Sequence, residues 1–445
     1  MSVHPIDSRI FGTAWGSDEL RTLFDDEGRT RGWCEVLAVL AEEEAAVGII
    51  PAVAGPEIAR VMRGEPVDLD EVRRGYAETG HSLLGLIRER ARRCRDGAGE
   101  WICYGATVQD IADTWCARTL LAVADLAERD LDAIEGRLAE LARAHRSTPM
   151  LGRTHGQAGL PITFGFKAAG WLDELRRHRE RLTQMRPRLG VGQLAGGVGT
   201  LSGYGPRGLE LQARVLARLG LGTPAISWTA ARDRFAEFVG WLALVTGALD
   251  RIGHEVYNLQ RPEIGELAEP ARGDDVGSIT MPQKRNPERA EHLGTLARLV
   301  RRDADLLLEA LVGDHERDGR SWKSEWAAIP GACLATGAAL RLARELLDGL
   351  EVRAEAMRRN LEAHQEEIAA EAVMLALARL VGKQTAHARV HAAAARARGA
   401  GRALRDELRE DPVTGGLLAA DEFERLLSTP STGLAEALVD RVLDG

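Results

Sequence analysis

Ser278, Lys284 and Asn286 lie within one short polar segment, Gly277 to Asn286, between two stretches with helical periodicity. The segment also contains Pro282, and glycine and proline at such positions favour a loop. A serine and a lysine six residues apart in such a loop suit a mobile element that closes over an anion. A solvated hinge is the alternative, because serine beside glycine is common in hinges.

Two other polar segments precede helical runs. Residues 78–82 (ETGHS) contain His81, and residues 105–114 (GATVQDIADT) contain Thr107 and Gln109. A hydroxyl side chain in either segment can cap the helix that follows. In the second segment, the hydroxyl and the free backbone N–H groups of a helix start also form an anion site. Capping and binding are compatible there, so both interpretations stay open.

A fourth segment concentrates polar groups between two glycines. Its sequence, GRTHGQ at 152–157, supplies a cation, a hydroxyl, an imidazole and an amide from Arg153, Thr154, His155 and Gln157. A single histidine at such a place is usually structural. The density of polar groups before an apolar run favours a functional site, and both readings stay open.

Two further motifs do not support a cofactor or a metal. The glycine-rich stretch 197–203 lacks the dinucleotide-binding spacing, and no strand-like run precedes it. Residues 315–318 (HERD) have no second histidine one helical turn away, which a zinc site of that kind requires. We therefore expect no cofactor and no metal, and we interpret 197–203 as a turn between helices.

The elements that must position these groups are helices. Apolar residues recur in steps of three and four in three long stretches, and period-two alternation is scarce. The pattern predicts an all-α fold with a long-helix bundle. The three apolar seams run from Ala117 to Leu141, from Phe235 to Leu259 and from about Glu288 to Val312.

At 445 residues, the chain exceeds the size at which one core keeps growing. We predict an N-terminal helical domain over 1–105, a central long-helix domain over 106–350 with a loop at 274–291, and a C-terminal helical domain over 351–445. Val239, Trp241 and Leu244 widen the apolar surface of the central helix, which predicts burial on more than one side. A bundle shared between subunits explains this, as does the interior of a monomeric bundle.

Composition excludes several partner classes. The net charge is −9 with no clustered basic tail, so nucleic-acid binding is disfavoured. The first residues show no basic region followed by an apolar run, and no uncharged apolar stretch is long enough to span a membrane. The five cysteines form no CxxC pair. These features predict reduced thiols and a cytoplasmic protein without membrane contact.

Taken together, the four segments resemble the fumarase/aspartase superfamily, in the usual order of its motifs. The run GSxxMPxKxNPxxxE, from Gly277 to Glu291, carries most of this resemblance. GATVQDIADT, GRTHGQ and the later HERDGRSWKSEW resemble 3-carboxy-cis,cis-muconate cycloisomerases. TGHS around His81 resembles adenylosuccinate lyases instead.

The resemblance implies an all-α fold in three domains, a homotetramer, and active sites that each draw residues from three subunits. It implies removal of a proton next to a carboxylate of a small dicarboxylate, followed by loss of a leaving group from the neighbouring carbon. The roles it implies are a base (Ser278), ligands of the aci-carboxylate (Lys284 and Asn286), carboxylate-binding residues (Thr107, Gln109 and Thr154), a proton donor (His155 or His81) and a contact to the distal part of the substrate (Arg317).

Two positions depart from the superfamily pattern. Ile279 stands where a second serine is usual, and Val108 stands where a serine or threonine is usual. Both changes remove hydrogen-bond donors, which predicts a leaving group smaller or less polar than a nucleotide.

Three functions follow from the resemblance. We expect a lyase that cleaves a C–N or C–O bond of a substituted succinate and releases fumarate. The first alternative is a lactonising 3-carboxy-cis,cis-muconate cycloisomerase of aromatic catabolism. The second is a non-enzymatic structural protein, which predicts damaged loops; Ser278, Lys284, Asn286 and His155 are intact.

Overall fold

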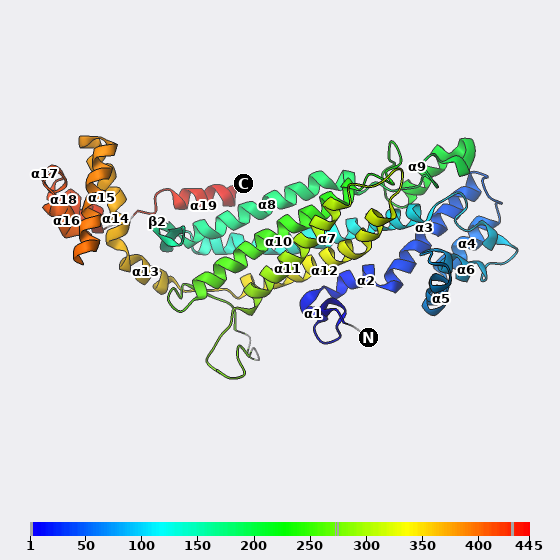
Figure 1. The fold of residues 1–445 in the computed structure, drawn as a ribbon, viewed down its shortest axis with the longest axis horizontal. Helices are drawn as coiled ribbons and strands as arrows, with labels where there is room; N and C mark the ends of the chain where they lie inside the picture. Colours follow the sequence, from blue (N-terminus) through cyan, green and yellow to red (C-terminus); the bar gives the residue numbers. More distant parts are fainter. Residues whose placement is uncertain (1–2, 272, 274–275, 429–430) are drawn as a thin grey trace. The chain divides into compact units, whose positions relative to one another are not determined.

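The computed structural model describes residues 3–271, 273, 276–428 and 431–445. Asp274 and Asp275, at the start of the predicted loop 274–291, lie outside the described residues. The described chain is mostly helical (Figure 1), which confirms the all-α prediction. The α-helices are α1 (Gly12–Trp15), α2 (Asp18–Phe24), α3 (Asp26–Ala46), α4 (Ala54–Arg63), α5 (Leu69–Thr79), α6 (Leu84–Ala91), α7 (Val108–Ala144), α8 (Phe164–Leu189), α9 (Gly208–Arg218), α10 (Asp233–Gln260), α11 (Glu288–Glu309), α12 (Gly319–Asp348), α13 (Ala354–Ala363), α14 (Gln365–Val381), α15 (Lys383–Ala400), α16 (Leu404–Glu410), α17 (Thr414–Leu417), α18 (Ala420–Ser428) and α19 (Ala435–Asp444).

The remaining regular elements are short. Three 3₁₀ helices are η1 (Pro5–Asp7), η2 (Ala98–Trp101) and η3 (Ser202–Arg207). Two antiparallel two-stranded sheets pair β1 (Pro149–Thr154) with β2 (Gln157–Thr163) and β3 (Leu267–Ala268) with β4 (Glu351–Val352).

The predicted apolar seams lie in long helices of the structure. The first lies within α7 and the second within α10, and their apolar positions are buried because they face other helices. The third helix, α11, ends at Glu309 rather than at Val312. Leu311 and Val312 follow it in turn-like backbone and are exposed, so they do not extend its buried seam.

Contacts divide the chain into two compact units that interleave along the sequence. The first unit comprises Met1–Ala133, Leu175–Arg251 and Glu291–Arg344. The second comprises Ile134–Glu174, Ile252–Ala290 and Glu345–Gly445. Each of the five long helices contributes residues to both units. The division into 1–105, 106–350 and 351–445 therefore stays a prediction.

Within the first unit, segments of the long helices pack with α1–α6 and α9. The Trp241 indole N–H of α10 donates to the His178 carbonyl of α8 at 2.8 Å. The α12 helix is long and apolar enough to resemble a membrane span in length and composition, and 67% of its most apolar window is buried inside the structure. Burial of that kind also marks the core helices of folded proteins.

Within the second unit, α14, α15, α16 and α18 share a small apolar core. Val373 and Leu408 are fully buried there, and Phe423 and Leu427 are nearly so. The β1–β2 hairpin packs elsewhere in this unit, where Leu151 lies against Leu361 and Ile368.

Candidate active site

The loop between α10 and α11 closes on itself through its own polar groups. The Asn286 side-chain amide donates to the Gly277 carbonyl at 2.7 Å, and the Lys284 N–H donates to the Met281 carbonyl at 3.0 Å. A Cβ atom at Gly277 would lie 2.2 Å from the Lys284 carbonyl oxygen. Only glycine fits at 277, and the close approach holds the two ends of the loop together.

Ser278 sits at the start of this loop with donors aimed at its hydroxyl. Its Oγ accepts backbone N–H groups from Met281 at 3.0 Å and from Thr280 at 3.3 Å. The same oxygen lies 3.3 Å from the Thr280 hydroxyl. Backbone donors on one oxygen would stabilise negative charge there. The loop therefore gives Ser278 the surroundings that a serine base requires.

Arg285 anchors the loop to the body of the second unit. Its guanidinium donates to the Glu269 carbonyl at 2.9 Å and to the Glu351 carboxylate at 3.0 Å. The Gln260 side chain donates to the Arg285 carbonyl at 3.2 Å and accepts from the Glu269 N–H at 2.8 Å. These contacts fix the backbone next to Lys284, whose side chain is exposed.

GRTHGQ, interpreted from sequence as a polar loop, is a β-hairpin with a two-residue turn. Thr154 pairs with Gln157, and His155 and Gly156 between them have φ of 54° and 73°. Two consecutive positive φ values characterise a type I′ turn, which suits the twist of a hairpin. The turn places Thr154 and His155 at an exposed tip. The sequence signal was weak because His-Gly is an unusual turn pair and the strands contain Gly152, Gly159 and Pro161.

Arg153 points away from that tip and holds the hairpin in place. Its guanidinium makes two hydrogen bonds to the Glu266 carboxylate, at 2.6 and 2.9 Å. Glu266 is fully buried and also accepts from the Asn360 side chain at 2.8 Å. A buried carboxylate with paired donors is well satisfied. Arg153 therefore positions Thr154 and His155.

In the first unit, Thr107 and Arg317 contact each other. The Arg317 guanidinium donates to the Thr107 hydroxyl oxygen at 2.9 Å and to the Gly197 carbonyl at 3.0 Å. Because the Thr107 oxygen accepts this bond, its own proton remains available to a ligand. Thr107 directly precedes α7, where the helix start favours an anion. The pair is suited to bind a carboxylate.

Asp110 holds the backbone next to the Thr107–Arg317 pair through its carboxylate. Its carboxylate accepts N–H groups from Thr107 at 3.0 Å and from Ala195 and Gly196 at 2.9 Å. Burial raises the pKa of Asp110 to about 6, against the opposing effect of these hydrogen bonds.

The stretch 197–203, predicted as a turn, follows Gly196 as turn and irregular backbone that leads into η3.

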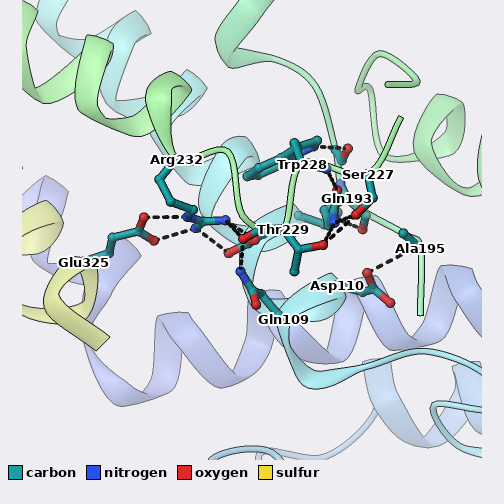
Figure 2. A network of polar contacts seen from close by, with 12 residues as sticks. Gln109, Asp110, Gln193, Ala195, Ser227, Trp228, Thr229, Arg232 and Glu325 are labelled. Carbon is teal, nitrogen blue, oxygen red and sulfur yellow. Dashed lines mark hydrogen bonds and ion pairs between the residues drawn. The ribbon is translucent and has the colours of Figure 1, made fainter. Parts of the chain in front are cut away.

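Gln109 is fully buried, and its amide donates to the Thr229 carbonyl at 3.0 Å. It belongs to the polar network of Figure 2, in which Arg232 pairs with two carboxylates. In this arrangement its side chain supports the start of α7 and does not join the Thr107–Arg317 pair. Its substrate contact stays a prediction.

Sequence reasoning missed the centre of that network. Arg232 bonds to Asp113 at 2.7 and 3.0 Å and to Glu325 at 2.6 and 2.7 Å. All three side chains are buried, and burial raises the pKa of Glu325. The available signal was a charged residue, Asp113, inside an apolar helical run. The network joins α7, the residue just before α10 and α12 within the first unit.

His81 caps a helix through its own ring. Its Nδ1 accepts the Leu84 N–H at 3.2 Å and the Leu83 N–H at 3.4 Å at the start of α6. The capping interpretation of this segment is correct, but Thr79 and Ser82, the residues expected to cap, do not do so. With Nδ1 accepting, the ring proton lies on Nε2. His81 is exposed.

Comparison with known proteins is consistent with this geometry. Residues 15–301 match the family described as "Lyase", and residues 367–442 match "Adenylosuccinate lyase C-terminus". The chain is 38% identical over 444 residues to an N-acetyl-S-(2-succino)cysteine lyase of Dickeya dadantii (strain 3937), covering 100% of this chain and 98% of that protein. It is 38% identical over 440 residues to a 3-carboxy-cis,cis-muconate cycloisomerase of Pseudomonas aeruginosa, covering 98% and 96%.

A solved structure extends the similarity to three dimensions. The crystal structure of a fumarate lyase from Mesorhizobium sp. BNC1 matches with a TM-score of 0.88 and 36% identity, covering 97% of this chain and 98% of that one. The two family matches and the full-length similarity agree with the motif resemblance. The chain therefore belongs to the fumarase/aspartase superfamily and is an enzyme of that superfamily.

Proposed function

We propose that this enzyme catalyses anti β-elimination on a 2-substituted succinate and releases fumarate. The observation that carries the proposal is the loop 277–286, in which two backbone N–H groups point at the Ser278 oxygen. Such a site can hold the serine oxygen as an anion, and that anion is a strong base.

In the proposed reaction, Ser278 removes a proton from the carbon next to one carboxylate. The electrons move into that carboxylate, giving a doubly charged aci-carboxylate, which Lys284 and Asn286 bind. The Asn286 amide donates to the Gly277 carbonyl at 2.7 Å and, through a longer bond of 3.4 Å, to the Glu288 carboxylate, and the substrate would replace Glu288 as the second acceptor. The leaving group then departs from the neighbouring carbon with its bonding electrons and takes up a proton.

Thr107 and Arg317 bind the substrate in this scheme, because the hydroxyl proton and the guanidinium both suit a carboxylate. Thr154, at the hairpin tip, binds the other carboxylate.

We assign the proton donor to His155 rather than to His81. His81 would lose its capping hydrogen bonds if Nδ1 were also protonated, whereas His155 lies at an exposed hairpin tip. His81 then contributes a neutral Nε2–H as a hydrogen-bond donor. Exchanging each histidine for glutamine separates the roles: His155→Gln should lower kcat far more than His81→Gln.

The leaving group is proposed to be small or weakly polar. Ile279 follows Ser278 and is 94% exposed, so an aliphatic side chain next to the proposed base is free to contact the substrate. A relative that matches over its full length is named for an S-(2-succino) thioether. A succinyl thioether therefore joins the C–N and C–O substrates as the first compound to test, with a thiol as the product.

The test is a panel of succinyl compounds with fumarate absorbance as the readout. The panel contains N-acetyl-S-(2-succino)cysteine, an N-substituted aspartate, adenylosuccinate and 3-carboxy-cis,cis-muconate. Fumarate release from either of the first two supports the proposal. Turnover of carboxymuconate alone would contradict it.

The second candidate is the lactonising cycloisomerase. It rests on the GRTHGQ hairpin and on similarity to a named cycloisomerase over nearly the whole chain. In that reaction a carboxylate of the substrate adds across its own double bond, and no fumarate forms. Lactone formation on the same panel identifies this activity.

We also propose a cytoplasmic homotetramer in which each active site draws residues from three subunits. The proposal of shared sites is supported by the exposure of residues assigned to the active site. Thr154, His155 and most of the loop 279–285 lie at the surface of the single chain, where a second subunit can reach them. Light scattering should give a mass four times the 48.3 kDa of one chain. A monomeric mass with full activity would contradict the shared site.

A further inference from the structure

Two histidines stand one helical turn apart on the outer side of α15. His387 and His391 are both exposed, and their rings stack with centroids 6.1 Å apart and an interplanar angle of 13°. The buried side of α15 is formed instead by Ala386, Val390, Ala393 and Ala397, which face the core of the second unit. The two imidazoles therefore project together from a helix held by packing on its other face.

Residues four apart on a helix lie on the same face, so their side chains can reach one ion. Imidazole nitrogen suits zinc, copper and nickel, and zinc binds it at about 2.0–2.1 Å. Two imidazoles on one such ion have ring centroids roughly 5 Å apart. The observed separation is 6.1 Å with the rings stacked, so each side chain has to turn about its bonds to direct one ring nitrogen at a shared ion.

The surroundings leave the pair accessible. Ala388 and Ala395 lie within one turn of His391, whereas Lys383 and Gln384, both exposed, lie one turn before His387, so the His391 side of the pair is the more open. Arg389 reaches toward Asp411 at 3.9 Å, which turns its charge to another side of the helix. The described residues contain no group of three or more His, Cys, Asp or Glu side chains able to hold a metal. Any ion bound here keeps water at its remaining positions.

We propose that His387 and His391 form a two-imidazole clamp that binds one divalent transition-metal ion, such as Ni²⁺, Cu²⁺ or Zn²⁺, on the outer face of α15. The clamp is independent of the proposed elimination reaction, because neither histidine belongs to the candidate active site.

The test is a calorimetric titration of the full chain, without an added histidine tag, with NiCl₂. Wild type should bind one Ni²⁺ per chain at this clamp, and Cu²⁺ should bind more tightly. Changes in the second shell of metal sites cost about 10- to 100-fold in affinity, so His391→Ala, which removes a direct ligand, should cost at least about tenfold. His254→Ala removes an exposed histidine of α10 and serves as the matched control, with affinity unchanged.

A variant that changes the spacing of the two histidines tests whether binding requires residues four apart. His391→Ala combined with Ala392→His retains two exposed imidazoles but places them five residues apart, off a common face. It should lose affinity as His391→Ala does, with unchanged circular dichroism. Equal Ni²⁺ affinity in the spacing variant and wild type, or no Ni²⁺ binding by wild type, would overturn the clamp.

Discussion

At the scale of single residues, the Thr107 hydroxyl is proposed to take part in two hydrogen bonds. Its oxygen accepts from Arg317, and its proton is left for a substrate carboxylate. Thr107→Val keeps the side-chain shape and removes both contacts. A hydrogen bond to a charged group contributes roughly 1.5–3 kcal/mol, so kcat/KM should fall about 10- to 100-fold. Thr183→Val, an exposed change on α8, is the control, and equal kcat/KM in all three proteins would exclude Thr107 from binding.

Glu44 is a residue whose burial has a consequence for stability. Its carboxyl is fully buried, neither oxygen has a hydrogen-bond partner among the described residues, and burial raises its pKa to about 9. The folded protein thus holds a proton that the unfolded chain has already released. The stability that goes with this retained proton is fully present below the pKa of the unfolded chain, near 4.5. It is lost as pH rises toward 9, where the free energy of unfolding falls by up to about 1.4 kcal/mol per pH unit.

Glu44→Gln removes that titration with little change in shape. The Tm of the variant relative to wild type should therefore rise steadily between pH 5 and pH 9, the window set by the two pKa values. Thermal melts of both proteins at several pH values measure it. A Tm difference that does not change with pH would show that Glu44 ionises normally.

At the scale of elements, long helices were predictable and short ones were not. The seams of α7 and α10 repeat over many turns, so the hydrophobic period alone defined them. The β1–β2 hairpin escaped prediction because its strands contain glycine and proline and its turn depends on the positive φ of His155, which no pattern reveals. The loop 277–286 was recognisable as a loop, whereas the donors to Ser278 arise from backbone geometry.

The hairpin gives a prediction at this scale. Glu266→Gln removes the negative charge that fixes Arg153, so Thr154 and His155 lose their support. We expect kcat/KM to fall about tenfold or more and the free energy of unfolding to fall by about 2 kcal/mol. Glu362→Gln breaks an exposed ion pair with Arg358 and should change neither. Unchanged activity in Glu266→Gln would show that the hairpin is held by its apolar contacts alone.

At the scale of the whole molecule, the sequence indicated the superfamily, and its division into three domains stays a prediction. The two compact units are each assembled from separated segments, which a reading along the chain cannot anticipate. The polar network around Arg232 was missed for a related reason, since Asp113 lies in α7, Arg232 just before α10 and Glu325 in α12. Motif spacing identifies functional groups, whereas their partners depend on tertiary contacts.

The proposed shared site predicts complementation between two impaired chains. Ser278→Ala and Thr107→Val, denatured together and refolded, should form mixed tetramers in which some sites contain both native residues. Activity should then exceed the sum of the two separately refolded proteins. Activity equal to that sum would contradict a site that draws these residues from different subunits.

The most direct measurement of the central claim is turnover by Ser278→Ala. Fumarate release should be followed with the best substrate of the succinyl panel, after the variant is shown to keep the wild-type circular dichroism and mass. General base catalysis contributes about 10²- to 10⁴-fold, so kcat should fall by at least that factor. Gln283→Ala, an exposed change in the same loop, should stay near wild type. Near-normal turnover by Ser278→Ala would contradict the serine base and the mechanism built on it.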